Sequence, residues 1–110
     1  MTKYKGIVSL LVAVVLTARL GTIQFNGHAE TWYNLRMNRV VERADKTLGT
    51  TDLYWVRDDG VKMYGPLVIC AADWSVHPQY SFVETSLGTG IVLDAHTTND
   101  SELIDIATNW

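Results

Sequence analysis

Three aspartates in the second half of the chain are the residues best suited to chemistry. Asp73 and Asp94 each end an apolar run, and Asp105 lies inside the next apolar patch. A carboxylate on an apolar face is partly desolvated, which raises its pKa, and nearby carboxylates raise it further. Such a cluster holds one protonated acid beside charged partners, as glycosidic-bond cleavage requires. Aspartates at strand ends also cap turns, and the residues alone leave both interpretations open.

Short extended segments must position these carboxylates. Residues two apart on a strand share a face, so a strand over residues 91–95 predicts Asp94 on the face of Val92 and His96. Residues 103–108, which contain the third aspartate, are either a strand or a last helical turn.

The remaining chain predicts several short strands and one helix. Apolar residues at helical spacing predict a helix over residues 39–48, with Gly49 just past its end and Asn34 or Asn38 as its N-cap. Asp58-Asp59-Gly60 lies between two β-prone runs, which indicates a hairpin. Strands are expected over residues 31–33, 53–57, 61–64, 67–72, 81–85 and 91–95, with a turn at residues 88–90.

Composition bounds the class of protein. A chain of 110 residues with 47% hydrophobic residues is typical of one folded domain. The net charge of -3, with no basic cluster, gives no electrostatic footprint for nucleic acid. Cys70 is the single cysteine and lies in an apolar run, so we expect a buried core residue and no internal disulfide. Several strands in so small a chain favour a barrel, which removes exposed edges.

The N-terminus has a composition of its own. An apolar run over residues 7–18 follows two lysines and has the length of a signal-peptide core, short for a membrane span. Cleavage before Glu30 is the first interpretation; an uncleaved membrane anchor and a buried structural segment are the alternatives. The predicted organisation is a signal peptide or anchor in residues 1–29 and one extracytoplasmic domain in residues 30–110. Contact with a membrane is expected only through an uncleaved N-terminal segment.

The order of short motifs carries further information. Ala71-Ala72-Asp73 is followed by Val76-His77-Pro78, Gly88-Thr89-Gly90 and Leu93-Asp94, and Ile104-Asp105-Ile106 comes about eleven residues later. This order resembles the three-aspartate (3D) domain. That family is a double-psi β-barrel found in stationary-phase survival and resuscitation-type cell-wall proteins and in a membrane-bound lytic murein transglycosylase.

The resemblance implies both fold and function. The implied fold is mainly β, a small six-stranded double-psi β-barrel with one short helix, preceded by an N-terminal hydrophobic signal or anchor helix. The implied activity is non-hydrolytic cleavage of the MurNAc–GlcNAc bond of peptidoglycan, which leaves an anhydro sugar. Asp105 is then the general acid and base, and Asp94 and Asp73 orient it and bind sugar hydroxyls. No cofactor or metal is implied.

The chain also departs from the family pattern. The family's Asp-Thr-Gly-Gly stands here as Asp94-Ala95-His96-Thr97, and loss of the glycines reshapes the backbone approach to a sugar. Trp74 replaces a proline and is a candidate for stacking on a sugar ring; Lys62 and His96 are candidate substrate contacts. The alternative function is a catalytically silent barrel that binds glycan or an envelope protein. The histidines and aspartates match no specific metal-binding spacing.

Overall fold

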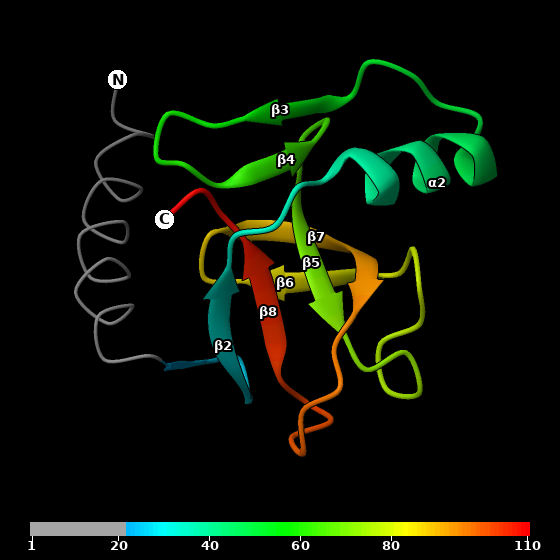
Figure 1. The fold of residues 1–110 in the computed structure, drawn as a ribbon. Helices are drawn as coiled ribbons and strands as arrows, with labels where there is room; N and C mark the ends of the chain where they lie inside the picture. The colour runs from blue at the N-terminus through cyan, green and yellow to red at the C-terminus, as the bar shows by residue number, and fades with distance from the viewer. Residues whose placement is uncertain (1–21) are drawn as a thin grey trace.

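The computed structural model describes residues 22–110 as a mainly β fold with one helix, which confirms the predicted class (Figure 1). The predicted signal or anchor segment at residues 7–18 lies outside the described residues. Within residues 22–110, no helix combines the length and the apolar character that crossing a membrane requires.

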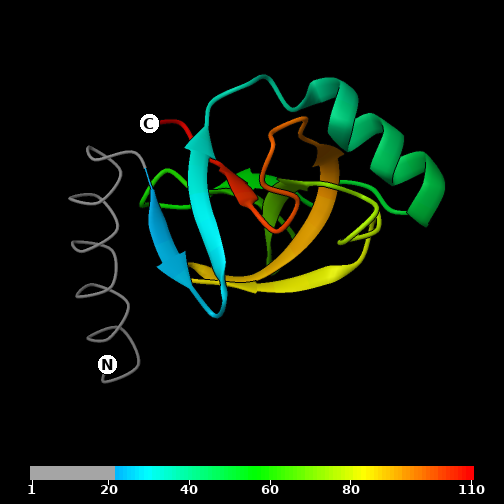
Figure 2. The same cartoon turned by 90° about the horizontal axis from the view of Figure 1, so that it is seen from below.

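Within residues 22–110, eight strands form one branched sheet. They are β1 (Ile23–Phe25), β2 (His28–Tyr33), β3 (Tyr54–Val56), β4 (Lys62–Tyr64), β5 (Leu67–Ala72), β6 (Phe82–Thr85), β7 (Gly88–Ala95) and β8 (Ile104–Ala107). Its main path runs β1-β2-β8-β5-β4-β3, while β7 pairs with β5 and β6 pairs with β7. The pairs β2–β8 and β5–β7 are parallel and all the other pairs are antiparallel; Figure 2 shows β2 and β8 side by side.

The sheet differs from the predicted six-stranded barrel in strand number and in closure. Among the described residues, β1 and β3 end the path and no pairing joins them, so the sheet stays open. The unpredicted strand β1 turns into β2 through Asn26 and Gly27, whose φ angles of 49° and 84° suit a two-residue hairpin. The folded unit therefore starts before Glu30, and the predicted boundary between residues 29 and 30 falls inside β2.

The helix α2 (Asn38–Leu48) confirms the predicted helix and its end. Gly49 adopts the left-handed conformation, with φ 69°, and donates its N–H to the Asp45 carbonyl. The predicted N-cap is wrong: Met37 occupies that position without a side-chain cap, and Asn38 is already helical. Met37 is instead buried, so packing rather than capping fixes the start of the helix.

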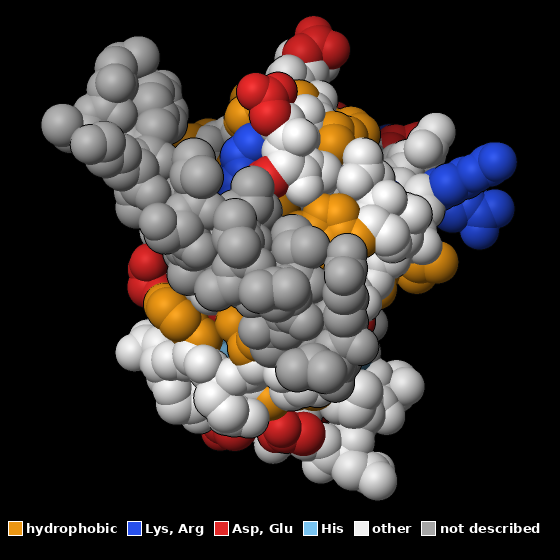
Figure 3. Space-filling model, turned by 90° about the vertical axis from the view of Figure 1, so that its left-hand side faces the viewer, with side chains coloured by type: hydrophobic (Ala, Val, Ile, Leu, Met, Phe, Trp, Pro, Cys, Tyr) orange, Lys and Arg blue, Asp and Glu red, His pale blue; other side chains and the backbone are white. Residues whose placement is uncertain are grey.

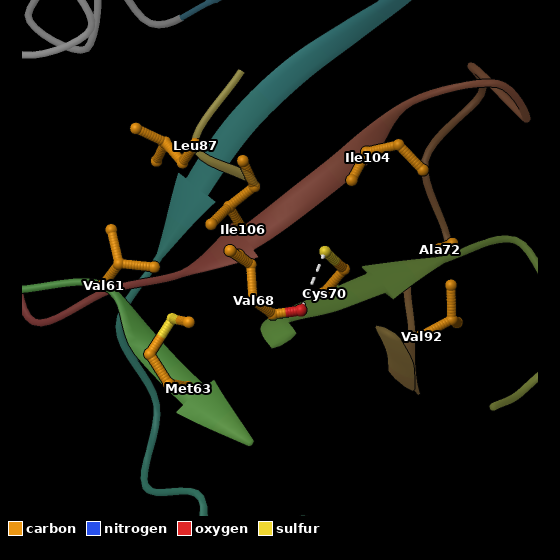
Figure 4. Packing of buried hydrophobic residues seen from close by; sticks show 9 residues of the cluster. All are labelled: Val61, Met63, Val68, Cys70, Ala72, Leu87, Val92, Ile104 and Ile106. Atoms are coloured by element: carbon orange, nitrogen blue, oxygen red, sulfur yellow. Dashed lines mark hydrogen bonds between the residues drawn. The ribbon is translucent and has the colours of Figure 1, made fainter. Parts of the chain in front are cut away.

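Two hydrophobic clusters cover opposite faces of the central strand β5, which explains its continuous apolar run. Cys70 belongs to the first cluster, as predicted, and its thiol donates to the Val68 carbonyl (Figure 4). Ile69 belongs to the second cluster, which joins the sheet to α2; Figures 1 and 2 show this helix beside β7. The first cluster comprises Val61, Met63, Val68, Cys70, Ala72, Leu87, Val92, Ile104 and Ile106. The second comprises Met37, Val40, Ala44, Tyr64, Ile69, Ile91, Leu93 and Ala107.

The turn predicted at residues 88–90 lies two residues earlier. Ser86 and Leu87 connect β6 to β7, and Gly90 is a strand residue paired with Val68. A Cβ at Gly90 would lie 2.6 Å from the Cys70 Sγ atom, so this glycine serves close packing rather than a turn.

We therefore expect Gly90→Ala to destabilise the protein by about 1–3 kcal/mol, the usual cost of overpacking a core. Urea unfolding of the wild type, Gly90→Ala, Cys70→Ala and the double variant measures the coupling. Since Cys70→Ala removes the sulfur that a new methyl group would strike, Gly90→Ala should cost less in that background. Equal costs in both backgrounds would contradict the packing argument.

Candidate functional site

The structure places Asp94 and Asp105 on one face of the sheet, on either side of Ala71. Ala71 of β5 pairs with Asp94 of β7 and also with Asp105 of β8. Residues paired in register present their side chains to the same face. The two backbones are two strand spacings apart, roughly 10 Å, so the carboxylates flank the small Ala71 side chain. All three aspartates are partly buried.

A β-bulge determines the face on which Asp94 lies. Cys70 pairs with Val92, but Ala71 pairs with Asp94, so Leu93 is an extra residue in β7. In a regular ladder Ala71 would pair with Leu93, and Asp94 would share the face of Val92. The prediction that Asp94 and Val92 share a face is therefore wrong, since the bulge turns the carboxylate to the side of Asp105.

Asp105 has the environment that an acid needs in order to keep its proton. Burial raises the pKa of its carboxyl group. A hydrogen bond of 2.8 Å from the Thr31 hydroxyl to Oδ1 and the charge of His96 act in the opposite direction but do not cancel the shift. The neighbouring strand β2 supplies Thr31, which is the register partner of Asp105. Burial thus raises the pKa of Asp105 as predicted, whereas the predicted contribution of the neighbouring carboxylates is not found.

Asp73 behaves as a turn residue. Its Oδ1 atom accepts hydrogen bonds from the backbone N–H and the hydroxyl of Ser75, at 2.9 and 2.6 Å. These two bonds are the main cause that lowers the pKa of Asp73, and the charges of His96 and His77 lower it further. Asp73 follows the end of β5, so it takes no part in the pairing that places Asp94 and Asp105 on either side of Ala71.

His96 fastens the loop between β7 and β8. Its Nε2 atom donates to the Leu103 carbonyl at 2.6 Å, since a carbonyl oxygen only accepts. Its Nδ1 atom accepts from the backbone N–H of Thr98 at 3.3 Å. Because both ring nitrogens bind the loop itself, His96 holds the segment that leads into Asp105.

The other two predicted substrate contacts differ in accessibility. The Trp74 indole N–H donates to the backbone carbonyl of Asp94 at 3.0 Å, and 38% of the residue remains exposed. Its ring is thus held beside the site and still open to a ligand. Lys62 is buried, which lowers the pKa of its ammonium group, and Nζ donates to Asn34 Oδ1 and to the Leu35 carbonyl at 2.8 and 2.7 Å. Lys62 therefore joins β4 to the segment after β2.

Tyr33, the last residue of β2, belongs to the site although no sequence motif indicates it. It lies two residues after Thr31 and so shares the face of the two carboxylates. Its hydroxyl is buried, with no hydrogen-bond partner in the described part of the chain. Burial raises the pKa of Tyr33, and the negative charges of Asp94 and Asp105 contribute to the rise. Only the alternation of faces along β2 could have indicated this residue.

Within residues 22–110, the three aspartates neither line the groove on α2 nor belong to a metal-binding cluster. A groove of about 630 Å³ is lined by α2 residues together with Met37 and Tyr54, and none of the three aspartates borders it. Across residues 22–110, no group of three or more His, Cys, Asp or Glu side chains is arranged to hold a metal ion. Asp94 and Asp105 thus share the sheet face that packs against α2, but they lie outside this groove.

No protein-family model, curated protein or solved structure matches the chain. Its function is therefore argued from the placement of these side chains.

The raised pKa of Asp105 predicts a stability effect that depends on pH. The ordinary pKa is 3.8, and a raised folded-state pKa contributes stability that is present below this value and is lost as pH rises through the folded pKa. Asp105→Asn removes the charge and keeps an oxygen for Thr31. We expect the variant to be more stable than the wild type at neutral pH, with this advantage disappearing towards pH 3.

Urea unfolding between pH 3 and 7 measures that difference. The titratable groups that interact with Asp105 are His96, Tyr33 and Cys70, and Asp94→Asn provides the comparison at the second carboxylate. A difference between wild type and Asp105→Asn that does not change with pH would contradict the raised pKa.

Proposed function

We propose that the chain is an open variant of the three-aspartate double-psi barrel, and that it cleaves peptidoglycan glycan strands between MurNAc and GlcNAc. The observation that carries the proposal is the pairing of both Asp94 and Asp105 with Ala71. Two carboxylates flank one small residue, and burial keeps the pKa of Asp105 raised. The order of the aspartates and the parallel pairs β2–β8 and β5–β7 support the family assignment.

The proposed reaction needs one carboxyl group that acts first as a general acid and then as a general base. Protonated Asp105 gives its proton to the glycosidic oxygen, and the C1–O bond breaks with its electron pair passing to the leaving sugar. The negative charge of Asp94 stabilises the positive charge that develops at C1. Asp105, now a carboxylate, takes the proton of the C6 hydroxyl of the same sugar, and the C6 oxygen bonds to C1. No water is consumed and no cofactor takes part.

The surroundings of the pair suit a glycan. The exposed Trp74 ring beside Asp94 offers a stacking surface for a sugar. Where the face in Figure 3 is coloured, acidic and basic side chains lie at separate places beside hydrophobic ones. The net charge of -3 gives no reason to propose a nucleic-acid partner. Because peptidoglycan lies outside the cytoplasm, the proposal also includes export of the chain.

Product analysis tests the proposal directly. The full chain is incubated with purified peptidoglycan in water enriched in heavy oxygen, and the products are weighed by mass spectrometry. The expected products are anhydromuropeptides without heavy oxygen, because the C6 hydroxyl replaces water. Products that carry one heavy oxygen would indicate hydrolysis, and the absence of any product from wild-type protein would reject the enzyme.

A second function has one observation in its favour. His96 fastens the loop after Asp94 through both ring nitrogens, where the family pattern has glycines. A fixed loop of this kind suits a barrel that binds glycan without cleaving it. Co-sedimentation with peptidoglycan but no anhydro product would support this binding function, and loss of both would reject the two functions together.

A further inference from the structure

The hydroxyl of Tyr33 is an unpaired donor in the proposed site. It is buried, and no group in residues 22–110 forms a hydrogen bond with it. Buried polar groups in folded proteins are nearly always paired, so an exception calls for an explanation. Since Tyr33 shares the face of Thr31 and Asp105, an explanation by a ligand places that ligand beside the carboxylates.

The groups around this phenol fix what it can do. Asp94 of β7 and Asp105 of β8 act on it electrostatically, as does the Cys70 thiol of β5, and burial adds to their effect. All of these influences raise the pKa of Tyr33, so the phenol stays protonated and remains a donor at neutral pH. Thr31 donates to Oδ1 of Asp105, and no described residue donates to Oδ2.

The chemistry of the ligand follows from this set of groups. A bound atom must accept from the phenol and should also donate to a carboxylate. An ammonium group cannot accept, and the two carboxylates repel a phosphate or another anion. A neutral hydroxyl does both through a single oxygen atom.

We propose that Tyr33 is a substrate contact that donates its phenolic proton to a hydroxyl oxygen of a bound sugar, while that hydroxyl donates to Asp105 or Asp94. This inference rests on the proposed function and extends it to a residue outside the three-aspartate motif. It also makes a prediction for a glycan-binding protein that does not cleave, because it concerns binding alone.

The variant Tyr33→Phe tests the proposal with two measurements on the full chain. Binding of a chitin tetrasaccharide, which presents sugar hydroxyls but no MurNAc, should weaken about tenfold, as expected for one lost hydrogen bond. The unfolding midpoint of the free protein in urea should not fall, because the hydroxyl has no partner to lose. The control Tyr54→Phe removes a hydroxyl from exposed β3 and should leave both quantities unchanged.

The contrary outcomes are distinct. If Tyr33→Phe lowers the unfolding midpoint and leaves tetrasaccharide binding unchanged, the hydroxyl is structural and this inference is wrong, whatever the wild type does to peptidoglycan. If wild-type protein neither binds the tetrasaccharide nor acts on peptidoglycan, the proposed function fails and this inference fails with it.

Discussion

Replacing Asp105 by asparagine is expected to lower the rate of anhydromuropeptide formation by about 100- to 10,000-fold, the usual contribution of general acid–base catalysis. Asparagine keeps the size of the side chain and an oxygen that accepts from Thr31. It has no proton to give to the glycosidic oxygen and no basic carboxylate to deprotonate the C6 hydroxyl. The loss should therefore appear in kcat, with little change in the affinity for glycan.

Two matched variants complete this experiment. Asp58→Asn makes the same chemical change in the exposed hairpin turn and should retain wild-type activity. Asp94→Asn removes the negative charge on the far side of Ala71 and should reduce kcat without abolishing it. Equal product yields from wild type and Asp105→Asn would remove Asp105 from the mechanism, and co-sedimentation with the wall would then favour the binding function.

The variant Glu30→Ala should lower the free energy of unfolding by about 3–5 kcal/mol, as expected when several buried hydrogen-bond donors lose their acceptor. Glu30 is fully buried on β2 and accepts from three donors. The backbone N–H and the hydroxyl of Ser86 bind it at 2.9 and 2.5 Å, and His28 Nε2 lies at 3.1 Å. Alanine would leave these donors buried without an acceptor and would separate β2 from the turn between β6 and β7.

Urea unfolding measures this loss against two controls. Glu30→Gln keeps one acceptor oxygen for Ser86 and should cost less than Glu30→Ala. Glu84→Ala removes an exposed carboxylate from β6, where it accepts only from Thr89, and should cost little. A similar loss for Glu84→Ala and Glu30→Ala would show that the buried contacts of Glu30 add nothing specific.

Much of the fold could be predicted because its signals are local. The apolar run of β5 and the apolar spacing of α2 gave those elements almost to the residue, and the Asp-Asp-Gly turn gave the β3–β4 hairpin. Strand β1 was missed although Asn26-Gly27 is a recognised hairpin signal, because its location within the presumed leader masked it. The turn at Gly88-Thr89-Gly90 was misplaced because a glycine required for close packing has the same sequence signal as a turn glycine.

The site could be predicted only in part, since its geometry depends on pairing between distant strands. The order of the aspartates singled out Asp94 and Asp105, but no local pattern reveals the extra residue Leu93 that turns Asp94 to their common face. Tyr33 and Glu30 lie three residues apart on β2, so their side chains point to opposite faces of the sheet. Which neighbours they meet is decided by β6–β8, more than fifty residues later.

The central position of β8 has a consequence for the order in which the chain folds. This last strand lies between β2 and β5 and contributes Ile104 and Ile106 to the core. A chain synthesised from its N-terminus therefore cannot complete this core until residues 104–107 are available. Contacts between such distant segments also slow folding. The core should thus remain incomplete until β8 has been synthesised, and it should close in a step that follows the appearance of this strand.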